Sequence, residues 1–144
     1  MHIFIRSIWE IIKTFLTGIV SSVIFALMIY SELAISDAFV CLVLNSAALF
    51  MFLYIHFINW SRLYEESSIS AEYFIPTISS FAIYAAVSSY FYSKRFSLYM
   101  WLFLPTRFLE PKLPVQYAPL SVVVAHILFF LLIFLSPVFY ERRR

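Results

Sequence analysis

The sequence predicts an all-α membrane protein with four transmembrane helices, and three observations support this fold class. Hydrophobic residues make up 63% of the 144 residues and charged residues only 12%, whereas a typical soluble domain carries about 25% charged residues. Four apolar segments are long enough to cross a bilayer, because a hydrocarbon core about 30 Å thick needs roughly 20 helical residues. No Asp, Glu, Lys or Arg lies inside any of them. A chain of this length forms one polytopic domain, residues 1–144.

The N-terminal residues predict an amphipathic helix ahead of the first span. Residues 2–13 place Arg6, Glu10 and Lys13 at helical spacing on one stripe, with isoleucines and a tryptophan elsewhere. This pattern is typical of a helix that lies in the membrane interface. We therefore expect an interfacial helix over residues 2–13 that leads into a span over residues 14–30.

The other three spans are expected over residues 38–58, 74–92 and 120–140. Helices associate in lipid through close approach of their backbones, so small residues at helical spacing indicate packing faces. The first and third spans each carry such a stripe: Gly18, Ser22 and Ala26 in the first, and Ser79, Ala82, Ala86 and Ser89 in the third. The fourth span is bulky, and we expect much of it to face lipid or a second copy of the chain.

Basic residues next to the spans predict that both termini are cytoplasmic, since cytoplasmic loops accumulate Lys and Arg. Arg6 and Lys13 precede the first span, Arg62 lies in the second loop, and residues 142–144 are all arginine. Four basic residues after the third span count against this orientation. The chain is compact and has no evident eukaryotic sorting signal. We therefore expect a multi-pass protein of the bacterial inner (plasma) membrane.

The segment between the third and fourth spans combines an apolar run with prolines. Residues 96–104 are too few to cross a bilayer, and a fifth span would place Arg107 in lipid at a cost of about 2.5 to 3.5 kcal/mol. The sequence instead predicts an interfacial or shallow re-entrant segment over residues 96–109 that is broken at Pro105. Irregular backbone at membrane depth must be satisfied by protein or water. We therefore expect the proline stretch to pack on the bundle or to line a wet cavity.

Four polar residues are candidates for a ligand or partner site: Asn45, His126, Arg107 and Glu110. Asn45 and His126 each lie about seven or eight residues inside a span, roughly 10 to 12 Å deep in the same leaflet, so they can meet. Their hydrogen bond would be a packing contact or, because histidine titrates near neutrality, part of a proton or ligand site. Arg107 and Glu110 share one face of a helical turn. There they pair with each other or with headgroups, or Arg107 offers its guanidinium to a carboxylate or phosphate.

Enzymatic signatures are missing from the sequence, which favours a protein without catalytic residues, cofactor or metal. It has no Gly-x-Ser-x-Gly, no His-x-x-x-His pair and no glycine-rich phosphate loop. Cys41 is the single cysteine, so an intrachain disulfide is excluded. The basic residues are dispersed, which argues against a nucleic-acid partner.

Three function classes follow from these observations. Abundant packing surface, with 21% aromatic residues suited to contact, favours a structural or accessory subunit of a larger membrane assembly. The alternative is a homo-oligomeric channel or transporter for an ion or small solute, with Asn45, His126, Arg107 and the serines of the third span along its route. A weaker possibility is a lipid-handling protein centred on Arg107. The expected partners are membrane lipids and either other membrane subunits or further copies of the chain.

Overall fold

The fold is a bundle of four long helices with a short irregular segment at one end. The computed structural model describes residues 2–29, 37–67, 69–94 and 103–142. The long helices are α1 (His2–Ile29), α3 (Ala38–Glu66), α4 (Ser70–Ser93) and α6 (Ala118–Arg142), and the 3-10 turns are η1 (Leu104–Arg107), η2 (Glu110–Lys112) and η3 (Val115–Tyr117). The described ranges hold no strand. All four long helices are long and apolar enough to cross a membrane, so the predicted fold class is confirmed in these terms.

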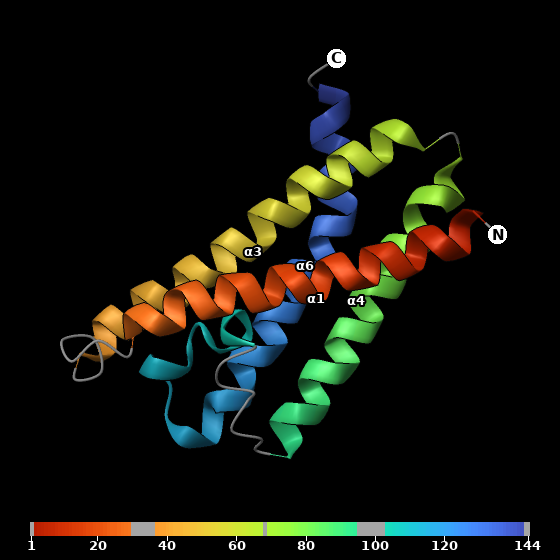
Figure 1. The fold of residues 1–144 in the computed structure, drawn as a ribbon. Helices are drawn as coiled ribbons and strands as arrows, with labels where there is room; N and C mark the ends of the chain where they lie inside the picture. The colour runs from red at the N-terminus through yellow and green to blue at the C-terminus, as the bar shows by residue number, and fades with distance from the viewer. Residues whose placement is uncertain (1, 30–36, 68, 95–102, 143–144) are drawn as a thin grey trace.

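The helices pack so that the two ends of the bundle differ. α1 packs on α3 and α4, and α6 packs on the same two helices from the other side. The start of α1, the end of α6 and the end of α3 lie toward one end of the bundle, while η1–η3 lie at the other (Figure 1). Both chain termini are therefore on the same side, as four spans require. Which compartment that side faces stays a prediction.

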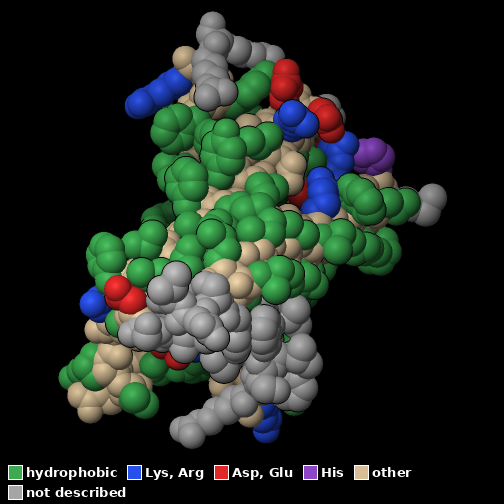
Figure 2. Space-filling model, turned by 60° about the vertical axis from the view of Figure 1, so that its left-hand side comes forward, with side chains coloured by type: hydrophobic (Ala, Val, Ile, Leu, Met, Phe, Trp, Pro, Cys, Tyr) green, Lys and Arg blue, Asp and Glu red, His purple; other side chains and the backbone are tan. Residues whose placement is uncertain are grey.

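Apolar side chains cover the outside of the bundle. Figure 2 shows hydrophobic side chains across the middle of one face, with the Lys, Arg, Asp and Glu side chains gathered toward its two ends. On α6, for example, Phe130, Leu131 and Phe134 are between 40% and 48% exposed. This arrangement matches a bilayer, whose core accepts apolar side chains and leaves charges at its two interfaces.

The N-terminal part of the chain differs from the prediction. Residues 2–13 are not a separate interfacial helix, because α1 continues unbroken to Ile29. The charged stripe also faces inward: Glu10 is only 2% exposed and pairs with Lys13, and Arg6 lies 3.7 Å from Glu72 on α4. No proline or glycine interrupts this stretch, and neighbouring helices supply a polar lining. The stripe is therefore the bundle-facing side of a long helix.

Closely packed aromatic rings fill the middle of the bundle. Phe52 on α3 lies 4.9 Å from Phe129 on α6 and 5.2 Å from Tyr84 on α4, measured between ring centroids. Trp60 stacks on Phe129 at 5.2 Å, and Phe103 reaches Tyr84 at 5.6 Å. Aromatic pairs at these spacings gain about 0.5 to 1.5 kcal/mol beyond the apolar area that they bury.

Only one of the two predicted small-residue stripes is a packing face. Gly18 on α1 receives the Tyr84 side chain, because a Cβ at Gly18 would lie 3.1 Å from the Tyr84 ring, and Ala26 is buried. On α4 the predicted stripe was wrong, since Ala82 and Ala86 are exposed. The buried face of α4 lies elsewhere: Tyr73, Thr77, Ser80, Tyr84 and Ser88. Tyr84 fills the space beside Gly18, and this contact determines which face of α4 packs against α1.

Enlarging Gly18 should destabilise the bundle. Gly18→Leu forces a side chain into the space occupied by Tyr84, so we expect a loss of about 1 to 3 kcal/mol in the free energy of unfolding. Unfolding in mixed micelles of mild detergent and dodecyl sulfate, followed by circular dichroism, measures this loss. Ala86→Leu is the matched control on the exposed face of α4 and should change stability by less than about 0.5 kcal/mol. Equal effects of the two substitutions would contradict this packing.

Candidate functional site

The candidate site is built around η1, a turn that replaces helix at one end of the bundle. Phe103, Leu104, Pro105 and Thr106 are all buried there. Pro105 has no N–H to donate and starts the turn, while Thr106 donates both its N–H and its hydroxyl to the Phe103 carbonyl, at 3.0 and 2.7 Å. η1 contacts α1, α3 and α6. The turn η1 therefore packs on the bundle, while an interfacial or re-entrant placement of residues 96–109 stays a prediction. The earlier residues of the predicted segment, 96–102, lie outside the described ranges.

Two polar side chains on α1 and α3 bind the backbone of this turn. The Leu104 N–H donates to the Ser22 hydroxyl on α1 at 3.1 Å. The Asn45 side-chain amide on α3 donates to the Arg107 carbonyl at 3.3 Å. Ser22 and Asn45 are themselves buried, at 0% and 5% exposure. Each helix thus supplies one bond that water would otherwise have to make.

A third side chain, Ser121 on α6, binds the turn twice. Its hydroxyl donates to the Thr106 carbonyl at 2.9 Å and accepts the Leu109 N–H at 3.0 Å. Ser121 is 1% exposed. We call Ser22, Asn45 and Ser121 the clasp. Together they provide hydrogen-bond partners for two N–H groups and two carbonyls that lie outside the α-helices. Buried backbone groups of this kind need such partners, because water cannot reach them.

Arg107 and Glu110 form a two-pronged ion pair on the outer side of the turn. The Arg107 Nε atom lies 2.6 Å from one carboxylate oxygen of Glu110, and Nη2 lies 2.9 Å from the other. The two side chains are only 17% and 29% exposed. The predicted pairing is confirmed. Such charge-assisted, bidentate bonds hold both side chains in fixed directions.

The four predicted site residues therefore fall into two neighbouring groups. Asn45, Arg107 and Glu110 lie together, joined by the Asn45 bond to the Arg107 carbonyl. His126 has a different partner, because its Nε2 atom lies 2.8 Å from the Ser88 hydroxyl on α4. The turn η1 contacts both α3 and α6. Its insertion between these helices gives Asn45 a backbone partner in place of the expected histidine.

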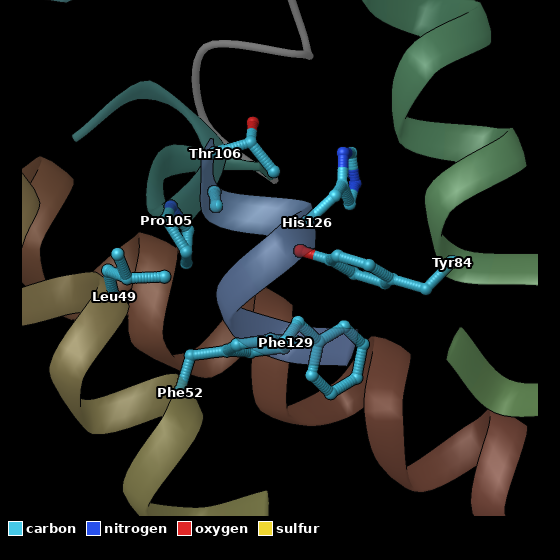
Figure 3. A pocket seen from close by; sticks show the side chains of 8 residues that line it. Leu49, Phe52, Tyr84, Pro105, Thr106, His126 and Phe129 are labelled. Carbon is cyan, nitrogen blue, oxygen red and sulfur yellow. The ribbon is translucent and has the colours of Figure 1, made fainter. Parts of the chain in front are cut away.

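A small cavity lies beside His126, on the inner side of the turn. Its volume is about 10 Å³, roughly the space that one water needs. Figure 3 shows the Tyr84 hydroxyl pointing toward the part of α6 that carries His126, with Thr106 on the facing side. The residues that line it are Leu49, Phe52, Tyr84, Pro105, Thr106, Ala125, His126 and Phe129.

A second histidine, His56, is buried in the bundle. It lies two residues from the end of the span predicted over residues 38–58, but α3 continues to Glu66 and His56 is 2% exposed. Its Nδ1 atom lies 2.8 Å from the Phe52 carbonyl, and its Nε2 atom lies 3.1 Å from the Thr14 hydroxyl on α1. A carbonyl can only accept, so Nδ1 carries the proton. The lack of a helix breaker between residues 58 and 66 was the signal that could have moved this histidine inward.

The described residues bring together no group of three metal-ligating side chains. Comparison of the chain with protein-family models, with curated proteins and with solved structures gives no match.

Removing the Ser121 hydroxyl should loosen the turn. Ser121→Ala takes away the partner of the Leu109 N–H and of the Thr106 carbonyl, and an unsatisfied buried group costs about 1 to 3 kcal/mol. We expect a loss of at least about 2 kcal/mol in the free energy of unfolding in mixed micelles. The control is Ser80→Ala, because the buried Ser80 hydroxyl donates to Thr77 within its own helix; it should cost less than about 1 kcal/mol. A Ser121→Ala protein as stable as the control would contradict the role of the clasp.

Proposed function

We propose that this chain is a small integral membrane protein that serves as a structural or accessory subunit of a larger membrane assembly. It binds its partner through residues 110–117, the segment that contains η2 and η3. The proposal rests on the exposure of apolar side chains on this segment. Val115 is 93% exposed and Tyr117 is 55% exposed, although both are attached to a turn that three helices hold in place.

The backbone of the segment is stiff, which suits a binding surface. Pro111 and Pro114 fix one dihedral angle each, and every turn is closed by its own hydrogen bond. The Leu113 N–H donates to Glu110 at 3.1 Å, and the Tyr117 N–H donates to Pro114 at 2.8 Å. A surface that is ordered before binding loses less conformational entropy when a partner docks.

The composition of the segment supports a protein partner. Val115 and Tyr117 supply an apolar centre, and exposed Lys112 with the Arg107–Glu110 pair supplies a polar edge. Protein interfaces have this anatomy of an apolar core within a polar rim, and tyrosine is enriched in them. The segment lies at the end of the bundle away from both termini (Figure 1), so the partner is expected to reach that side of the membrane.

The position of the intramembrane polar residues favours a subunit over a homo-oligomeric pore. A pore between copies needs polar side chains on the outside of each copy. Of the polar residues expected along such a route, Asn45 and Ser88 are 5% and 0% exposed and are engaged within the chain, whereas Ser89 on α4 is exposed. Arg107, which would anchor a lipid phosphate in a lipid-handling protein, directs two of its N–H groups at Glu110.

A charge at Val115 should release the chain from its assembly. Val115→Asp buries a carboxylate at the contact and is expected to cost at least about 2 kcal/mol, roughly 30-fold in affinity. Blue-native electrophoresis of gently solubilised native membranes that contain the tagged chain measures the change. We expect the wild type in a larger assembly and Val115→Asp as the free chain.

The control is Phe4→Asp, which places the same charge on a residue 68% exposed at the other end of the bundle, and it should migrate with the wild type. Wild-type protein found only as a monomer or simple homodimer, or Val115→Asp retained in the assembly, would contradict the proposal.

A further inference from the structure

A second surface feature lies at the end of the bundle that carries both termini. It is a groove of about 340 Å³ between the end of α3, the start of α4 and the end of α6, within the size range of small-molecule sites. Three tyrosines and one glutamate are among the residues that line it. The lining residues are Tyr64, Glu65, Ser67, Ile69, Ser70, Tyr73 and Tyr140.

The three tyrosines stand at steep angles to one another. Tyr64 meets Tyr73 at 5.3 Å between ring centroids with an interplanar angle of 85°, and meets Tyr140 at 5.9 Å and 72°. Tyr73 is fully buried at the base of the groove, where its hydroxyl donates to the Ile133 carbonyl at 2.7 Å. Tyr64 and Tyr140 are half-buried, so parts of these two rings remain accessible from the groove. Both rings line the groove, and groups of aromatic side chains form the cages that hold quaternary ammonium groups.

Carboxylates add negative charge at the same place. Glu65 lines the groove and is exposed. The Tyr64 hydroxyl donates to a Glu141 oxygen at 3.0 Å, which fixes the ring and shifts electron density onto its face. Among the described residues of α3, α4 and α6, the basic side chains are Arg62 and Arg142, and both are exposed to solvent, where water and salt screen their charge.

We propose that this groove binds a monovalent organic cation of the quaternary ammonium type. The cation comes either from the choline headgroup of a lipid or from a free choline-like molecule. Tyr64 and Tyr140 supply the aromatic walls and Glu65 the balancing charge. A quaternary ammonium suits the site because it has no N–H group that needs a hydrogen-bond acceptor. The groove and residues 110–117 lie at opposite ends of the bundle, so this inference does not depend on the proposed subunit role.

Calorimetric titration of the full chain with choline chloride tests the site, in a detergent that contains no choline group. The neutral isostere 3,3-dimethylbutanol serves as the second ligand, since it has the same shape without the charge. We expect choline to bind and the alcohol to bind at least about tenfold more weakly, because cation–π attraction needs the charge. Equal binding of the two ligands, or no binding of choline, would overturn the proposal.

Substitutions locate the binding to the groove. Tyr140→Leu and Glu65→Gln should each weaken choline binding by at least about threefold, while Tyr140→Phe, which keeps the ring, should not. Glu66→Gln is the matched control, because Glu66 is the exposed neighbour of Glu65 and is not among the lining residues. Glu65→Gln changes an exposed side chain and should leave the fold intact even if Tyr140→Leu does not. Unchanged affinity in both Glu65→Gln and a folded Tyr140→Leu would refute the assignment.

The two sources of the cation are separated by the lipid. The same titration is repeated in nanodiscs of phosphatidylglycerol alone and in nanodiscs that also contain phosphatidylcholine. A lower apparent affinity for choline with phosphatidylcholine present would assign the site to a lipid headgroup. An equal affinity in the two bilayers would assign it to a free cation.

Discussion

The whole bundle relies on one constraint, which is that buried backbone outside the α-helices must find its hydrogen-bond partners within the protein. η1 breaks the helical pattern at Pro105 and leaves N–H and carbonyl groups that a helix would have paired internally. The clasp residues Ser22, Asn45 and Ser121 pair four of them, at Leu104, Thr106, Arg107 and Leu109. A buried polar group without a hydrogen-bond partner costs several kcal/mol. The turn can therefore exist only where these three side chains converge, and the same bonds tie α1, α3 and α6 together.

The remaining features follow from this arrangement. Because η1 is anchored on its inner side, the Arg107–Glu110 pair and the segment 110–117 are held outward in a defined direction, and that direction makes them suitable for contact with a partner. The turn also separates Asn45 from His126, which bonds to Ser88 instead. In the middle of the bundle, packed aromatic rings fill the interior and Gly18 admits Tyr84. The polar interactions at one end and the aromatic packing beyond them thus restrict the helices to one mutual arrangement.

The sequence predicted four helices long and apolar enough to cross a membrane, and the Arg107–Glu110 pair was among the alternatives it offered. Both depend on local properties, namely apolar length and a three-residue spacing. It did not predict which helix faces point into the bundle or which residues from different helices meet. The direction of the Arg6–Glu10–Lys13 stripe was inverted, since a charged stripe looks the same whether it faces headgroups or a polar bundle interior. The packing face of α4 was also misplaced, because small residues indicate where helices can approach but not where Tyr84 finds its space. Asn45 was identified as important, yet its partner is a backbone carbonyl, which no residue pattern reveals.

Amide hydrogen exchange at Leu104 and Leu109 measures whether the Ser22 and Ser121 hydroxyls hold η1 against the bundle. Both N–H groups are bonded to clasp hydroxyls outside any regular helix, so their protection depends on those bonds. In protein reconstituted in a bilayer and observed by nuclear magnetic resonance, we expect both amides to exchange as slowly as amides in the middle of α6. Exchange as fast as at the exposed residue Gln116, on the outer part of the same segment, would contradict it.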